Sequence, residues 1–157
     1  MKIKLLKLLI VCSLIYSCGF TPILKDYENT NIEINKINFV GSNNELIYFL
    51  KNYLSLTENK KNGVNINFTV TESSVSVERD SAGVTIKEKL ALNIEMIVLN
   101  FDNKIINRDT FSESKDITIT SNPEIDNTTK DNERKNILKN LTQKIKFKIM
   151  VTLKNSK

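Results

Sequence analysis

The reactive chemistry that this sequence offers rests on cysteine, because the 157-residue chain has two cysteines and no histidine. Cys18 follows an apolar run at residues 8–15, and lysines 2, 4 and 7 precede that run. With its flanks the run has about ten residues, which is the length of a signal-peptide core. It is too short for a membrane-spanning helix, which needs about 20 residues.

The residues Ile15-Tyr16-Ser17-Cys18 have the pattern aliphatic, any, small, cysteine, and they resemble the lipobox cleaved by lipoprotein signal peptidase. There the thiol receives diacylglycerol, cleavage follows before the cysteine, and the new amine is acylated. Cys12 fails this pattern because the bulkier Val11 precedes it. We therefore predict a lipoprotein signal peptide at 1–17 and a lipidated Cys18, held in the membrane by more than one acyl chain. The alternatives are an ordinary signal peptide or a short membrane anchor.

Gly19 gives the predicted destination of the mature chain. Many bacterial lipoproteins that stay at the inner membrane carry Asp directly after the lipidated cysteine, whereas this chain has Gly19. By resemblance, we expect a lipid-anchored protein on the periplasmic side of the outer membrane.

Composition excludes several classes of function. The chain has 23 basic and 18 acidic residues, and removal of the three lysines in 1–17 leaves 20 against 18. This near balance argues against nucleic-acid binding. Without histidine or a free thiol, the mature chain cannot build a Ser-His-Asp or Cys-His catalytic site or a metal site based on these ligands. With four glycines and no phosphate-binding loop, the domain is expected to be a binding protein without a cofactor, and not an enzyme.

Hydrophobic periodicity predicts six elements in the order β-α-β-β-β-α. Alternating apolar residues indicate strands, and three- and four-residue spacing indicates helices. A bulge is expected near Asn35-Lys36, a capping box from Ser42 to Glu45, and a change of strand phase at Ser73-Ser74. The expected bounds are strand 32–40, helix 42–56, strands 64–77, 84–98 and 105–119, and helix 131–153.

This order predicts an α/β (α+β) two-layer sandwich. The β-α-β opening implies a right-handed crossover, with the first strand parallel to its partner. Short connections at 79–83 and 100–104 imply antiparallel pairing of the later strands, with the polar strand 105–119 at an edge. Both amphipathic helices are expected on one face of the four-stranded mixed sheet. The other face would meet solvent or a partner.

Three short motifs resemble the LPS-assembly lipoprotein family, LptE. They are Cys18-Gly19-Phe20-x-Pro22, the Asp-Ser-Ala-Gly stretch that runs from Asp80 to Leu90, and Glu133-Arg134 in the last helix. The resemblance covers nearly the whole mature chain, and it rests on the order and spacing of the three motifs. Lys87 stands where family members typically have Arg. Asn107 and Phe111 stand where Gly and Tyr are frequent.

The resemblance implies a subunit of the lipopolysaccharide transport and assembly complex. Such a subunit plugs the LptD-type outer-membrane β-barrel, assists its folding and contacts lipopolysaccharide. By alignment Lys87 is the first candidate for binding lipid A phosphates, with Lys89 and Arg79 beside it. Each of these cations has the alternative of being a solvated surface residue. The corresponding domains are the tether at 18–31, one LptE-like domain at 32–153 and a tail at 154–157.

A second interpretation belongs to a different class of function. The chain would be a periplasm-facing lipoprotein scaffold or binding module unrelated to lipopolysaccharide, sharing only the anchor and the sandwich. The two interpretations predict different partners, because only the first requires a large β-barrel.

Overall fold

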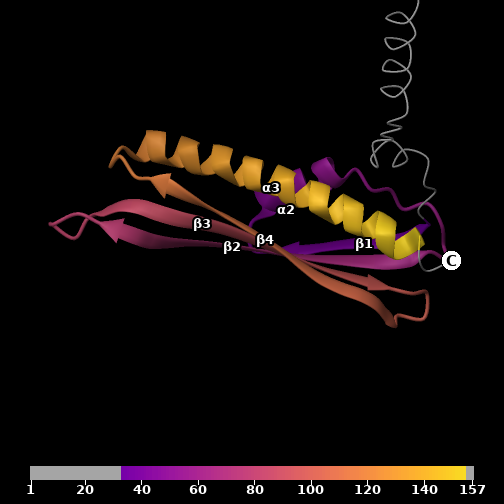
Figure 1. Cartoon of the computed structure of the whole chain (residues 1–157). Coiled ribbons are helices and arrows are strands. Elements are labelled where there is room, and N and C mark those ends of the chain that lie inside the picture. The colour runs from indigo at the N-terminus through magenta and orange to yellow at the C-terminus, as the bar shows by residue number, and fades with distance from the viewer. Residues whose placement is uncertain (1–32, 155–157) are drawn as a thin grey trace, which may run out of the picture. The chain divides into compact units, whose positions relative to one another are not determined.

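The computed structural model describes residues 33–154 (Figure 1). The predicted signal peptide, Cys18 and the tether lie outside the described residues, as does the end of the tail. The six elements come in the predicted order β-α-β-β-β-α. They are β1 (Ile34–Gly41), α2 (Asn44–Leu54), β2 (Val64–Arg79), β3 (Thr85–Leu99), β4 (Ile105–Thr118) and α3 (Pro123–Lys154).

The four strands form one mixed sheet in the order β1-β2-β3-β4. β1 runs parallel to β2, whereas β2–β3 and β3–β4 are antiparallel, as predicted. A register shift between Ile34 and Lys36 confirms the expected bulge. β1 pairs only with residues 64–70 of β2, so residues 71–79 have no strand beside them on that side within the described chain. β4 forms the opposite edge, as its polar sequence predicted.

Both helices lie on the same face of the sheet, which confirms the predicted two-layer arrangement (Figure 1). The buried side of β3 alternates from Leu90 to Val98, and the buried side of β2 from Ile66 to Val70. The helices cover this surface with apolar stripes at helical spacing. Fully or nearly fully buried are Leu46, Leu50 and Leu54 of α2 and Ile137, Leu138, Leu141, Ile145 and Ile149 of α3.

Both helices begin at different residues than the sequence predicted. The cap of α2 is Asn43 and not Ser42, because the Asn43 Oδ1 atom accepts the backbone N–H groups of Glu45 and Leu46. Asparagine is as strong a cap as serine, so the sequence offered two adjacent choices. This helix ends at Leu54, where Ser55 takes a left-handed conformation.

α3 begins eight residues before the predicted start. Asn122 caps it through the N–H groups of Glu124 and Ile125, and Pro123 occupies the first helical position, where its missing N–H costs nothing. The first turns escaped prediction because they carry no apolar stripe, and Ile125 is exposed.

The change of phase predicted at Ser73-Ser74 is also misplaced. β2 and β3 stay in regular register up to Ser76, and the irregularities fall between Ser76 and Arg79. Val75 and Val77 suggested a shift because they break the alternation, but both are exposed where β2 extends past the core. Val84, predicted to share the buried face of β3, lies in the turn and is exposed.

Polar contacts fasten α3 along the sheet. At its start Asp126 accepts hydrogen bonds from the backbone N–H and the hydroxyl of Thr120, each at 2.8 Å. Lys130 pairs with Glu88 at 2.8 Å. The later turns pair with β4 through Lys144 and Glu113 at 2.8 Å, then through Lys148 and Asp109 at 3.3 Å. Within residues 33–154, no helix combines the length and the apolar composition needed to cross a bilayer.

The Asp126 contact predicts a loss of stability in acid. The N–H and hydroxyl of Thr120 lower the pKa of Asp126 from its ordinary value. The ionised carboxylate therefore stabilises the fold above the unfolded pKa, and this contribution disappears as the pH falls through the lower folded pKa. The variant Asp126→Asn should be less stable than wild type at neutral pH. In urea unfolding the gap should narrow as the pH falls below the ordinary pKa of an aspartate and through the lowered folded pKa.

Thr120→Ser is the matched control, because serine keeps both donors to Asp126. Its unfolding free energy should follow the wild-type pH profile. A constant gap between Asp126→Asn and wild type at every pH would contradict the role assigned to this carboxylate.

Candidate functional site

The turn between β2 and β3 is built by the Asp-Ser-Ala-Gly motif. The Asp80 Oδ1 atom accepts the N–H groups of Ala82 at 2.9 Å and Val84 at 2.8 Å. Gly83 has φ of +80°, a conformation that glycine adopts without steric cost. The Arg79 Nη1 atom donates to the Gly83 carbonyl at 3.0 Å. The motif therefore specifies a fixed turn, which holds Arg79 at the tip.

The structure places the three predicted cations on this hairpin but does not join them in one cluster. Lys87 and Lys89 lie on the same face of β3, as their spacing predicted. Lys87 pairs with Glu78 of β2 at 2.7 Å. Its hydrogen bond to this carboxylate, reinforced by the opposite charge, raises the pKa of Lys87. Lys89 is exposed, with Val75 and Asp116 as its register neighbours on β2 and β4. The proposed binding role of all three remains a prediction.

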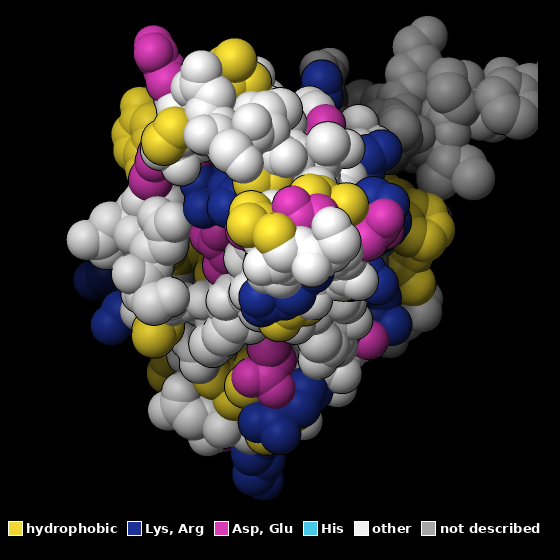
Figure 2. Space-filling view, turned by 90° about the vertical axis from the view of Figure 1, so that its left-hand side faces the viewer, with side chains coloured by type: hydrophobic (Ala, Val, Ile, Leu, Met, Phe, Trp, Pro, Cys, Tyr) yellow, Lys and Arg dark blue, Asp and Glu magenta, His cyan; other side chains and the backbone are white. Residues whose placement is uncertain are grey.

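Charges of both signs cover the end of the molecule that carries this hairpin. Figure 2 views that end and shows basic and acidic side chains next to one another, with apolar side chains between them. On the helix side of the hairpin, Lys130 and the hydroxyl of Ser74 lower the pKa of Glu88. Lys87 and Lys130 are therefore balanced locally, whereas the exposed Lys89 and Arg79 form no ion pair among the described residues, which makes them more accessible to an anion.

The uncovered face of the sheet is rich in amides and hydroxyls. Asn38 of β1 donates to Asn67 of β2 at 2.8 Å, and Asn35 donates to Asn65 at 2.8 Å. Asn65 in turn donates to Asn103 in the β3–β4 turn at 3.2 Å. Further along the strands the register places on this face Thr69, Thr71, Ser73, Asn93, Glu95, Thr110, Ser112 and Ser114. This surface can exchange hydrogen bonds with water or with a polar partner.

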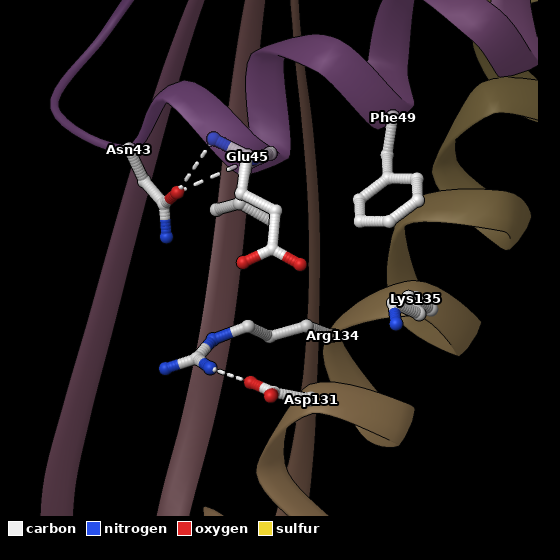
Figure 3. A pocket seen from close by; sticks show the side chains of 7 residues that line it. Asn43, Glu45, Phe49, Asp131, Arg134 and Lys135 are labelled. Atoms are coloured by element: carbon white, nitrogen blue, oxygen red, sulfur yellow. Dashed lines mark hydrogen bonds and ion pairs between the residues drawn. The ribbon is translucent and has the colours of Figure 1, made fainter. Parts of the chain in front are cut away.

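A small pocket lies between the start of α2 and the third and fourth turns of α3 (Figure 3). Its empty volume is about 200 Å³, open solvent included, which is below the usual size of a small-molecule site. Figure 3 shows Arg134 turned toward Asp131, with Phe49 and Lys135 on the other side. The lining residues are Asn43, Glu45, Leu46, Phe49, Asp131, Arg134 and Lys135.

Arg134 holds this region together. Its Nε atom donates to Glu72 of β2 at 2.7 Å, and its Nη1 atom donates to Asp131. Asn43, the cap of α2, reaches the other oxygen of Glu72 at 3.4 Å. The contact thus joins a strand and both helices. Sequence reasoning named Arg134 only as part of a motif and missed Glu72, because a pair separated by 62 residues leaves no local pattern.

The described residues offer contacts suited to binding. No group of three or more His, Cys, Asp or Glu side chains in 33–154 is arranged to hold a metal ion. The charged groups of the hairpin can bind anions through Lys and Arg, and the uncovered sheet face can bind through hydrogen bonds. These two surfaces are the candidate functional site.

No protein-family model and no curated protein matches this sequence. Solved structures match it at the level of the fold. Rare lipoprotein B from Shewanella oneidensis superposes with a TM-score of 0.60 at 11% identity, covering 77% of this chain and 98% of that one. A minor lipoprotein from Acinetobacter baumannii gives 0.57 at 14% identity, covering 73% and 90%. Lipoprotein B from Nitrosomonas europaea gives 0.54 at 10% identity, covering 74% and 84%.

These identities are too low to assign a family, but the coverage extends over most of each chain. Residues 33–154 therefore have the α+β fold of several bacterial lipoproteins, with a four-stranded mixed sheet and two helices on one face.

Proposed function

We propose that this protein is a lipid-anchored outer-membrane subunit of a lipopolysaccharide transport and assembly complex. In this role it plugs an LptD-type β-barrel, assists assembly of that barrel and contacts lipopolysaccharide. The observation that carries the proposal is the uncovered sheet face, which is rich in amides and hydroxyls, whereas the opposite face of the same strands holds the apolar core. The lipobox at Cys18 and the shared fold of bacterial lipoproteins support it.

The polar face suits a partner that encloses water. Amide and hydroxyl groups can bond to the polar inner wall of a large β-barrel either directly or through bridging waters. An apolar sheet face in the same position would stay in contact with water and polar groups, and its area would gain little from burial. One face of the sheet therefore packs against the domain's own helices, and the other face is available to a partner with a hydrated, polar inner wall.

The hairpin between β2 and β3 supplies the contact with lipopolysaccharide. β2 has 16 residues, so at about 3.3 Å per residue it spans roughly 50 Å. Its tip carries Arg79, and Lys89 lies on the neighbouring strand. Lysine binds a phosphate as a point charge, and arginine can bind it through two parallel hydrogen bonds.

Lipidation gives the first prediction for this function. Cys18→Ser should abolish acylation, because serine cannot supply the thiol that receives diacylglycerol. The matched control is Cys12→Ser, which removes the other cysteine and should leave acylation intact. Intact-mass measurement of the membrane fraction separates the two variants. Acylation that persists in Cys18→Ser, or disappears in Cys12→Ser, would refute the assignment of the anchor.

Copurification tests the partner. The acylated protein, tagged at its C-terminus and extracted in detergent, should recover a large outer-membrane β-barrel that mass spectrometry identifies. Its depletion should lower the amount of lipopolysaccharide at the cell surface. Recovery of only peptidoglycan or soluble proteins would instead support a lipoprotein scaffold unrelated to lipopolysaccharide.

Two substitutions on the hairpin should change lipopolysaccharide binding in opposite directions. Lys89→Ala removes an exposed cation and should weaken binding by roughly threefold, as expected for a solvent-screened charge contact. Glu78→Gln removes the carboxylate that pairs with Lys87, which frees this ammonium group and should strengthen binding. Lys139→Ala makes the same charge change on the exposed side of α3 and is the control. Equal affinities of all four proteins in a titration with lipopolysaccharide would exclude the hairpin as the contact.

A further inference from the structure

The end of the domain opposite the β2–β3 hairpin carries a group of exposed large apolar side chains. Phe101 in the β3–β4 turn is 59% exposed, and Ile105 at the start of β4 is 57% exposed. Ile106 is 40% exposed. Phe147 and Val151, one turn apart on α3, are 45% and 36% exposed. We call these five residues the apolar end cluster.

Hydrogen bonds show that the cluster lies at one end of the fold. Asn107 donates to Thr152 at 3.1 Å, which places the start of β4 and the end of α3 at the same end of the domain. Phe101 lies in the turn that leads into this strand. Its neighbour Asn103 accepts the bond from Asn65 near the start of β2. Figure 1 shows the end of α3 and the β3–β4 turn at the same end of the sheet.

The described chain also enters at this end. Val64, the first residue of β2, donates to the Glu33 carbonyl at 3.0 Å, and Ile34 pairs with Val64 in the sheet. Only 14 residues separate Glu33 from Cys18. A chain of this length spans at most roughly 50 Å even when fully extended. The acyl chains predicted at Cys18 must therefore lie within roughly 50 Å of Glu33, which is at the same end of the domain as the apolar end cluster.

Cations accompany the cluster. Lys104 follows the β3–β4 turn, and Lys61 lies in the loop before β2. Both are exposed, and neither has an ion-pair partner among residues 33–154. Asp102 is the acidic residue within the turn itself. Exposed aromatic and aliphatic side chains bordered by lysines are the combination that binds at the interface of a bilayer with anionic lipids.

We propose that the apolar end cluster docks on the phospholipid surface beside the lipid anchor. Phe101 and the neighbouring isoleucines enter the interfacial layer, and Lys61 and Lys104 meet the phosphates of the headgroups. The acyl chains at Cys18 hold the domain near the membrane, and the cluster fixes which end faces it. The β2–β3 hairpin then points away from the lipid surface. This proposal rests on the proposed lipid anchor but does not require a lipopolysaccharide contact.

The chain contains no tryptophan, so a single introduced tryptophan reports on its own surroundings. The test uses the acylated protein in vesicles of phosphatidylethanolamine and phosphatidylglycerol, with brominated lipids as quenchers from the membrane side and acrylamide from the water side. The reporter variants are Phe101→Trp in the turn and Val151→Trp on α3. The matched control is Val84→Trp, an equally exposed apolar position in the opposite turn.

Docking predicts that F101W and V151W emit at shorter wavelength than V84W, lose emission to brominated lipids and resist acrylamide. The proposal fails if F101W and V151W are as sensitive to acrylamide as V84W while the protein floats with the vesicles. It also fails if their emission changes only after a β-barrel partner is added, because the end would then bind protein. Failure of the wild-type chain to float would overturn the anchor and the docking together. Flotation with tryptophans that remain exposed to water would overturn the docking alone.

Discussion

One-sided burial is the constraint on which the rest of this structure depends. The apolar stripes of α2 and α3 cover one face of β2 and β3, where Phe68, Leu92 and Met96 are completely buried. A residue two positions away along a strand points to the same face, so this burial fixes the register of both central strands. It also determines that the intervening positions, such as Asn67 and Asn93, lie on the uncovered face. The interior and the polar surface are therefore consequences of the same alternation.

Charged contacts connect the helices to the strands outside the apolar core. Glu72 and Arg134 connect β2 with both helices, and Glu113 ties β4 to Lys144. These pairs are partly exposed, so each stabilises the fold by a modest amount. Their larger effect is on geometry. They hold α3 lengthwise over one face of the strands, and within residues 33–154 both helices lie on that face.

Sequence reasoning recovered the architecture because the architecture follows from periodicity. The alternation from Leu90 to Val98 predicted a long buried strand, and the four-residue steps from Ile137 to Ile149 predicted the last helix. Prediction failed where individual polar contacts decide the outcome. The first turns of α3 depend on Asp126 and Thr120, and such a contact has no periodic pattern. Likewise, the spacing of Lys87 and Lys89 gave their shared face, but the pairing of Lys87 with Glu78 required the register of the hairpin.

Within residues 33–154, no strand pairs with β2 from residue 71 to residue 79 on the side of the short strand β1, and open strand edges can pair with other chains. Here the two irregularities between Ser76 and Arg79 interrupt the ladder. An incoming strand would find residues 71–76 in regular order before the ladder becomes irregular. Glu78 adds a negative charge. Edge-to-edge pairing of two copies would have to bury this charge or place it near the same charge of the other copy. An irregular ladder and a charge at an open strand edge are features that oppose edge-to-edge pairing between copies of a chain.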